Sequence, residues 1–213
     1  MTNRSRILIA DDHNLVAELC KRLLETEFEV VGVVSDGRAL LRSARELKPD
    51  VIVLDIAMPV LNGLDAGRQV KKMLPGVKLV YLTMNPDTEV AAEAFARGAS
   101  GYLLKTCAAA EMVLAVRQVL LGKTYLSKTM SRDAIDSLRW QHKELISEEE
   151  RLTDRQREVL QLLAEGKSNK DVAGILNLST NTVETHRTRI MQKLDLHSTA
   201  DIVLYAVRKG IIS

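Results

Sequence analysis

The chain has few cysteine, proline and aromatic residues and no long apolar run. Its 213 residues include 2 Cys and 4 Pro, and 3% of them are aromatic. Cys20 and Cys107 lie far apart and match no metal-ligand spacing, which fits two ordinary thiols in a reducing compartment. No stretch is apolar enough to span a bilayer, and the N-terminal MTNRSR lacks a signal core. We therefore expect a cytoplasmic protein with no membrane partner.

The charge is nearly balanced, but it is unevenly distributed. Residues 1–122 hold 15 basic and 15 acidic residues, and residues 123–150 carry a net charge of −1. Residues 151–213 hold 10 basic against 7 acidic residues, a net charge of +3. This excess permits nucleic-acid binding without proving it. The length suits one α/β domain with a smaller second unit, and no internal repeat is visible.

Short apolar runs alternate with helical patterns over the first 122 residues. Runs of Val, Ile and Leu without polar alternation are typical of parallel strands buried on both faces. They cover Ile7–Ala10, Val30–Val34, Val51–Leu54, Leu79–Leu82 and Tyr102–Leu104. Five βα units predict a doubly wound, five-stranded parallel sheet of the flavodoxin-like α/β class.

Polar residues follow four of these runs: Asp11, Asp12, Asp55, Thr83 and Lys105. Open parallel sheets bind ligands beyond the carboxyl ends of their strands, so these side chains are expected at one rim. Three carboxylates this close repel one another unless a cation or phosphate joins them. Taken singly, each of these residues is more simply explained as a helix cap, a solvated charge or an ordinary strand residue. The prediction therefore depends on the five residues occurring together.

The set suits the transfer of a phosphoryl group onto a carboxylate. Asp55 ends the central strand and is the natural nucleophile. Asp11 and Asp12 would hold a hard cation, Mg²⁺, with the backbone carbonyl of Ala57 as a further ligand. Lys105 and Thr83 would offer an ammonium and a hydroxyl to the phosphate oxygens.

The motifs around these residues resemble the receiver domain of two-component response regulators. They are ADDH at 10–13, VLDIAMP at 53–59, LT at 82–83 and GYLLK at 101–105, within a resemblance that covers about residues 4–122. The resemblance implies phosphoryl transfer to Asp55 from a phosphohistidine of a sensor histidine kinase. It also implies a switch pair, Thr83 and Tyr102, although ordinary packing explains Tyr102 too. Met84 and Thr106 depart from the family pattern, which prefers a small residue and a proline there.

The rest of the chain is predicted to be helical. Residues 123–150 are expected to form a partly helical linker, with a helix over Ser131–Gln141. Capping boxes at Thr153 and Ser168 predict two helix starts, Ser179 or Thr180 caps a third helix, and a fourth runs from Thr199 to Lys209. The short turn between the second and third helices predicts an all-α, four-helix, helix-turn-helix domain over residues 151–213.

The third of these helices has one apolar and one polar face. Val183, His186, Ile190 and Leu194 share the face expected to pack inward, with His186 as a core histidine. The opposite face carries short polar side chains and cations, which suits a reader of the DNA major groove. It comprises Glu184, Thr185, Arg187, Thr188 and Lys193. For any one of them, a solvated helix face is the competing explanation.

Residues 152–160 (LTDRQREVL), 182–187 (TVETHR) and 193–194 (KL) resemble the LuxR-type helix-turn-helix. With the receiver, the chain resembles a NarL/FixJ-type response regulator over nearly its full length. That resemblance implies a homodimer that binds double-stranded promoter DNA and changes transcription, with RNA polymerase as a further partner to consider. Glu184, Thr185 and Thr188 would then contact base edges. The phosphate contacts would be Lys170, Asn181, Thr182, Arg187 and Arg189.

Two other functions are weighed against this hypothesis. A stand-alone aspartyl-phosphate phosphatase usually needs a second carboxylate two residues after its nucleophile, where this chain has Ala57. We therefore expect no enzyme beyond the domain's own phosphoryl transfer and dephosphorylation. A constitutive DNA-binding protein would need neither the acidic pair Asp11 and Asp12 nor the residues Asp55 and Lys105, all of which are present.

Overall fold

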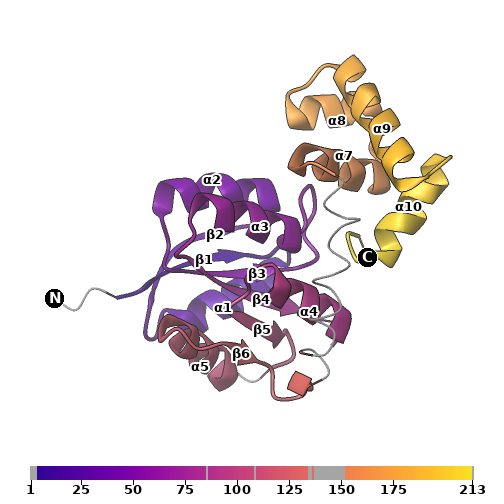
Figure 1. Ribbon diagram of the computed structural model, residues 1–213. Helices are drawn as coiled ribbons and strands as arrows, with labels where there is room; N and C mark the ends of the chain where they lie inside the picture. Colours follow the sequence, from indigo (N-terminus) through magenta and orange to yellow (C-terminus); the bar gives the residue numbers. More distant parts are fainter. Residues whose placement is uncertain (1–3, 85, 108, 134–135, 137–151, 213) are drawn as a thin grey trace.

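The computed structural model describes residues 4–84, 86–107, 109–133, 136 and 152–212. They form two parts, an N-terminal domain (residues 4–126) and a C-terminal domain (residues 152–212), as Figure 1 shows. Most of the helix predicted over Ser131–Gln141 lies outside the described residues, so that prediction is not tested. Within the described ranges, no helix combines the length and apolarity needed to cross a bilayer.

The N-terminal domain is built on one parallel sheet with the strand order β2-β1-β3-β4-β5-β6. The predicted doubly wound sheet is confirmed, but it has six strands instead of five. The sixth strand has only two residues and pairs with β5, so no apolar pattern announced it. The strands are β1 (Arg6–Ala10), β2 (Glu29–Val34), β3 (Val51–Asp55), β4 (Lys78–Thr83), β5 (Gly101–Leu104) and β6 (Tyr125–Leu126).

Helices cover both faces of the sheet, because alternate strand residues point to opposite sides. Ile7 and Ile9 pack in one apolar cluster with α1 (Asn14–Leu24) and α5 (Ala109–Leu120). Leu8 and Ala10 pack in a second cluster with the helices of the other face. These are α2 (Gly37–Leu47), α3 (Gly63–Met73) and α4 (Thr88–Ala96).

The strand register brings the predicted site residues to one edge. Ala10 lies opposite Leu54, and Asp55 lies opposite Leu82. Thr83 in turn pairs with Leu104, the residue before Lys105. The carboxyl ends of β1, β3, β4 and β5 therefore finish side by side, as predicted for a ligand-binding rim.

The C-terminal domain consists of α7 (Asp154–Ala164), α8 (Asn169–Leu176), α9 (Thr180–Leu194) and α10 (Thr199–Arg208) around a third apolar cluster. The capping boxes predicted at Thr153 and Ser168 are both present, and Ser179 caps α9. A third capping box, at Ser198, opens α10. Between α8 and α9, Asn177 adopts φ +52°, a left-handed conformation that asparagine tolerates. The left-handed backbone of Asn177 ends α8 and allows the short turn that a helix-turn-helix requires.

One glycine tests how tightly the rim is packed. A Cβ atom on Gly63 would lie 2.0 Å from the carbonyl oxygen of Asp55, so either the β3 end or α3 must move. We expect Gly63→Ala to lower the free energy of unfolding by about 1–3 kcal/mol in urea titrations. Gly76→Ala is the control, because no atom lies within 4 Å of its Cβ position. Equal stability of the two variants would contradict the close approach.

Candidate functional site

An acidic cluster occupies the carboxyl edge of the sheet. Asp11 and Asp55 are almost fully buried, with 1% and 2% of their surfaces exposed, whereas Asp12 is exposed. One ligand atom from each of Asp11, Asp12, His13 and Asp55 lies within 4.8 Å of the others. The three carboxylates lie where they were predicted. His13 was not predicted to belong to the cluster, although it directly follows the acidic pair.

Lys105 holds the two buried carboxylates together. Its ammonium nitrogen lies 2.9 Å from Asp11 Oδ2 and 2.8 Å from Asp55 Oδ2. Burial acts to lower the pKa of Lys105, but the hydrogen bonds and charges of Asp55 and Asp11 outweigh it and raise the pKa above its ordinary value. One ammonium against three carboxylates leaves an excess of negative charge when all three are ionised. A divalent cation would cancel that excess.

The donor set fits a hard cation bound through oxygen. Carboxylates of Asp11, Asp12 and Asp55 are the ligands that Mg²⁺ prefers, and the exposed side of Asp12 leaves room for the waters that it retains. His13 Nδ1 lies 2.9 Å from Asp12 Oδ1 and 3.4 Å from Asp11 Oδ1. The backbone N–H of His13 donates to Asp11 Oδ1 at 2.9 Å, and its imidazole lies beside the carboxylates without being a ligand type that Mg²⁺ prefers.

Thr83 and Tyr102 lie on the strands next to the acidic cluster, in β4 and β5. Both residues line a cavity of about 460 Å³, together with Ala57 and the end of α10. Tyr102 is fully buried in the cluster that also holds Tyr81, and burial raises the pKa of its hydroxyl well above the ordinary value. Its packing is thus sufficient to explain its presence. Met84, which departs from the family pattern, is 68% exposed and lies outside the core.

The β3–α3 loop (residues 56–62) connects Asp55 to α3 and contains an unusual backbone. Val60 has φ +69°, and the N–H of Leu61 donates to the carbonyl of Pro59 at 2.8 Å. A β-branched residue rarely adopts a positive φ, and such strained conformations cost about 1–3 kcal/mol each. Upstream, the N–H of Ala57 donates to Asp55 Oδ1 at 3.3 Å. The loop therefore contacts the acidic cluster directly.

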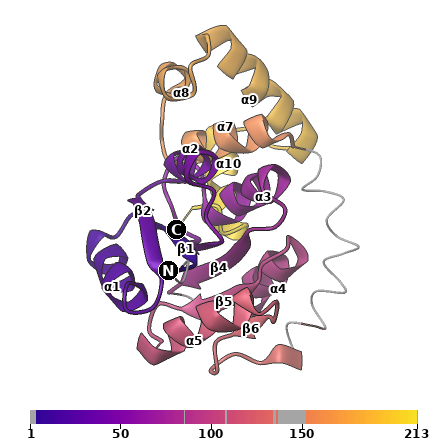
Figure 2. The same ribbon diagram turned by 90° about the vertical axis from the view of Figure 1, so that its left-hand side faces the viewer.

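The predicted DNA-reading surface lies on α9. Val183 and Ile190 are buried as predicted, and His186 is half-buried, where burial lowers the pKa of its imidazole. The exposed candidates are Lys170, Asn181, Glu184, Thr185, Thr188, Arg189 and Lys193, with Thr182 and Arg187 half-buried. Figures 1 and 2 place α7 beside α2 and α3, whereas α9 lies farther from the sheet.

Several of these side chains have partners within the domain. Glu184 accepts a hydrogen bond from the amide of Asn169, and Arg187 donates to Thr199 Oγ1 at 2.8 Å. Lys193 Nζ lies 3.3 Å from Gln156 Oε1, so it is directed toward α7.

Comparison with known proteins agrees with this architecture. Residues 7–117 match the response regulator receiver domain, and residues 150–206 match the bacterial regulatory proteins of the luxR family. The oxygen regulatory protein NreC of Staphylococcus haemolyticus (strain JCSC1435) is 36% identical over 214 residues, covering 97% of this chain and 99% of that protein. The transcriptional regulatory protein LiaR of Bacillus subtilis (strain 168) is 35% identical over 210 residues, covering 98% and 99%.

A solved structure is similar over both domains. A structure of two RcsB dimers bound to two parallel DNAs has a TM-score of 0.57 and 25% sequence identity, and it covers 96% of this chain and 98% of that one. With the acidic rim on a parallel sheet and the capped helix-turn-helix, these matches lead to one conclusion. The chain belongs to the NarL/FixJ-type response regulators, in which a receiver domain precedes a LuxR-type DNA-binding domain.

Proposed function

We propose that this response regulator accepts a phosphoryl group on Asp55 from a sensor histidine kinase and thereby changes its binding to promoter DNA. The observation that carries the proposal is the contact of Lys105 with both Asp11 and Asp55 at the rim. Lys105 thereby places a cation beside the carboxylate that would act as the nucleophile and near the phosphoryl oxygens that it would receive.

The transfer needs positioning and neutralisation of charge more than covalent help. A carboxylate oxygen of Asp55 attacks the phosphorus, the P–N bond to the kinase imidazole breaks, and that nitrogen takes up a proton. Lys105 and Thr83 stabilise the phosphoryl oxygens. Asp11, Asp12, Asp55 and the carbonyl of Ala57 would hold Mg²⁺, which when bound neutralises negative charge on those oxygens.

We further propose that the chain turns over no other substrate. A phosphatase of similar fold would use a carboxylate two residues after the nucleophile, and Ala57 has no acid–base group. Chemistry would be confined to phosphorylation of the domain and loss of the same group.

The DNA contacts are proposed to follow the predicted classes. Helix α9 enters the major groove, with Glu184, Thr185 and Thr188 at base edges. Lys170, Asn181, Thr182, Arg187 and Arg189 contact phosphates. The chain would bind as a homodimer, as RcsB does in the complex described above. Exposed Leu204 and Val207 (54% and 51%) provide apolar surface on α10 for that purpose, and RNA polymerase is a further proposed partner.

Replacement of the nucleophile tests the phosphoryl transfer. Acetyl phosphate with Mg²⁺ should label the wild type but not Asp55→Asn, because a carboxamide is too weak a nucleophile to attack the phosphorus and displace acetate. Intact-mass spectrometry measures the label. A mutant labelled to the wild-type level would exclude Asp55 as the acceptor.

Salt titration tests the mode of DNA binding. We expect the logarithm of the association constant to fall linearly with log[salt], with a slope of about −0.9 for each neutralised phosphate. Fluorescence anisotropy on a DNA site selected with this protein gives the slope. Affinity that does not change with salt would contradict docking of α9 against the phosphate backbone.

Two substitutions on α9 separate base reading from phosphate contact. Thr188→Ala should change the preferred sequence and cost about 1–3 kcal/mol at the preferred site, whereas Arg189→Ala should weaken all sites alike and make the salt slope shallower by about 1. Binding to a panel of single-base variants distinguishes them. The opposite pattern would mean that the two roles are exchanged.

A further inference from the structure

One side of the C-terminal domain is occupied by the β3–α3 loop of the N-terminal domain. Gln161 of α7 donates its side-chain amide to the carbonyl of Met58 at 2.9 Å and accepts from the N–H of Asn62 at 2.7 Å. Glu165 Oε1 accepts from the N–H of Val60 at 3.0 Å. The side of α7 that faces this loop is therefore already bound within the chain.

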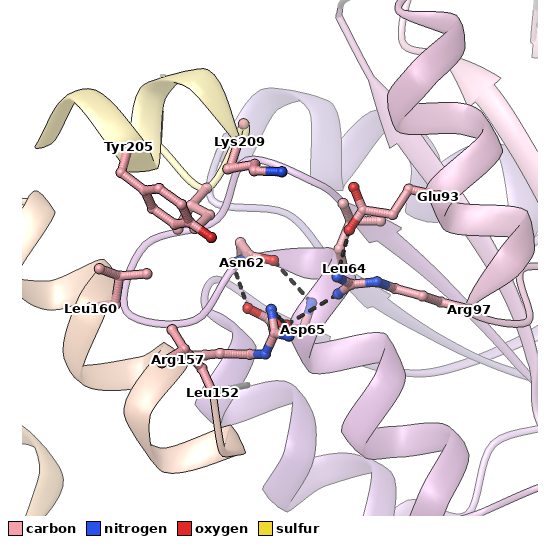
Figure 3. A pocket seen from close by; sticks show the side chains of 12 residues that line it. Asn62, Leu64, Asp65, Glu93, Arg97, Leu152, Arg157, Leu160, Tyr205 and Lys209 are labelled. Carbon is pink, nitrogen blue, oxygen red and sulfur yellow. Dashed lines mark hydrogen bonds and ion pairs between the residues drawn. The ribbon is translucent and has the colours of Figure 1, made fainter. Parts of the chain in front are cut away.

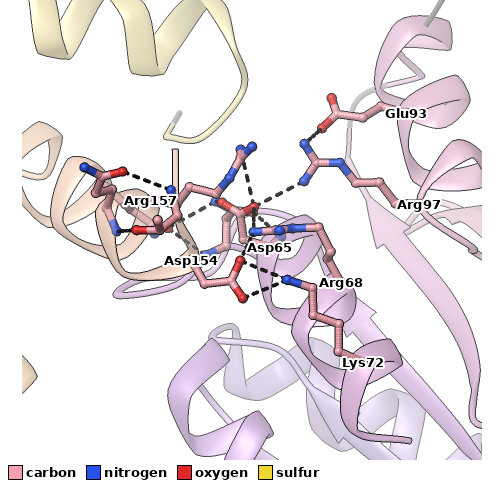
Figure 4. Close-up of polar contacts among 11 residues, drawn as sticks. Asp65, Arg68, Lys72, Glu93, Arg97, Asp154 and Arg157 are labelled. Atoms are coloured by element: carbon pink, nitrogen blue, oxygen red, sulfur yellow. Dashed lines mark hydrogen bonds and ion pairs between the residues drawn. The ribbon is translucent and has the colours of Figure 1, made fainter. Parts of the chain in front are cut away.

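Ion pairs hold the same side of the domain against α3 (Figure 4). Asp154 lies 2.6 Å from Arg68 Nη2 and 3.0 Å from Lys72 Nζ. A pocket of only about 20 Å³ remains beside Leu160 and Tyr205 (Figure 3), so this side is closely packed. The exposed residues of α9 lie outside this contact, and bonds within their own domain hold two of those predicted to read base edges.

Glu184, the acidic residue of the predicted base-reading set, is held by the neighbouring helix. The side-chain nitrogen of Asn169, the first residue of α8, donates to Glu184 Oε2. Chemistry fixes the direction of this bond, because an ionised carboxylate only accepts and an amide nitrogen only donates. Among the described residues, Asn169 is the only partner of this carboxylate, so Oε1 remains available to a ligand.

The bond orders a side chain that would otherwise move freely. Glu184 is exposed, and a glutamate on a helix surface samples several rotamers, so ordering it on binding costs affinity. Asn169 is half-buried and orders the carboxylate before DNA arrives. It also places the carboxylate beside the N-terminus of α8, where the helix dipole favours negative charge.

Thr185, the next residue, has its hydroxyl proton committed as well. Its Oγ1 donates to the backbone carbonyl of Asn181 at 2.9 Å, one turn earlier in α9. A hydroxyl has one donor, so Thr185 still offers an oxygen lone pair and a methyl group. The guanidinium of Arg187 is directed toward α10, where it donates to Thr199 Oγ1. At Glu184 and Thr185, α9 therefore presents hydrogen-bond acceptors and no donor.

A surface of acceptors distinguishes the four bases in the major groove. Guanine and thymine show acceptors there, which repel a carboxylate, whereas cytosine and adenine each show an amino group. The amino group of adenine is flanked by acceptors on both sides, its own N7 and O4 of the paired thymine. The amino group of cytosine has an acceptor on one side only. Glu184 Oε1 therefore fits cytosine best.

We propose that Asn169 is a positioning residue for base recognition: by holding Glu184 as an oriented acceptor, it makes α9 select a cytosine, bound through its amino group, at one position of the DNA site. The inference rests on the proposed function, since it concerns the major-groove contact of the same helix. It adds that a residue outside α9 helps to determine which base is read.

Binding to a panel of DNA sites tests the base and the reader. The panel varies each position of a site selected with the full-length protein, and fluorescence anisotropy is measured at one salt concentration. The wild type should prefer cytosine to guanine and thymine at one position by about tenfold or more. Glu184→Gln should change that preference to guanine, because Asn169 retains the amide oxygen and the amide nitrogen then faces the groove as a donor.

The other outcomes for Glu184→Gln are equally informative. A preference for adenine is expected of a glutamine free to use both its oxygen and its nitrogen, so it would show that Asn169 does not hold the side chain. A cytosine preference that survives the substitution would exclude Glu184 as its reader. Either result would overturn the inference, and a general loss of structure would not create a new preference for guanine.

Removal of the amide tests Asn169 itself. Asn169→Ala should weaken the cytosine preference about threefold or more, because the released glutamate must be ordered on binding. Preferences at the other positions should not change. Asn181→Ala, the same change at a proposed phosphate contact, is the matched control and should keep the cytosine preference. An unchanged preference in Asn169→Ala would contradict the positioning role, as would a further effect of Asn169→Ala when Glu184 is already alanine.

A measurement without DNA separates the inference from the proposed function. In NMR spectra of the free full-length chain, Glu184→Ala should shift the side-chain amide signals of Asn169 and leave those of Asn177, at the other end of α8, in place. Unmoved Asn169 signals would overturn the inference alone. A wild type that shows the bond but binds all DNA sequences equally would instead overturn the proposed major-groove docking, and the inference with it.

Discussion

A single ammonium group between two buried carboxylates is the interaction on which the N-terminal domain's chemistry depends. Asp11, Asp55 and Lys105 stand at the ends of three different strands, and the ammonium of Lys105 is the cation that pairs with both buried carboxylates. Even so, the cluster keeps more negative than positive charge once Asp12 is included. This excess of negative charge is the physical reason that the rim suits a divalent cation together with a phosphoryl group. The position of the β3–α3 loop matters as well, because Ala57 of this loop contacts Asp55.

Helix α7 connects this site to the DNA-binding domain because it is buried on both sides. Its apolar residues, such as Val159 and Leu163, pack in the C-terminal core, while Arg157 and Gln161 are covered by the N-terminal domain. Helix α9 takes no part in these contacts with the β3–α3 loop and keeps Glu184, Thr185 and Thr188 exposed. The three residues predicted to read base edges are therefore accessible while α7 contacts the β3–α3 loop.

The features that were predictable are those with a local physical cause. The apolar runs show where each strand ends, and the carboxyl ends of parallel strands lie at the same edge of a sheet. The five pocket residues were therefore expected at one rim. The capping boxes at Thr153 and Ser168 are set by residues three positions apart. In contrast, β6 has only two residues and carries no periodic signal. His13 was missed because its place in the cluster depends on side-chain direction at the end of β1.

The pattern of residues therefore specifies the two domains, the acidic rim and the capped helices, since each depends on neighbours in the chain or on a general property of sheets. It carries no sign that Gln161 binds Met58 and Asn62, about a hundred positions earlier, because a polar residue on an amphipathic helix is ordinarily solvated. The left-handed backbone of Val60 is equally invisible, as valine disfavours it in isolation. Both depend on tertiary structure: the bonds of Gln161 form across the domain interface, and the turn at Val60 is fixed by hydrogen bonds within the folded loop and by Glu165.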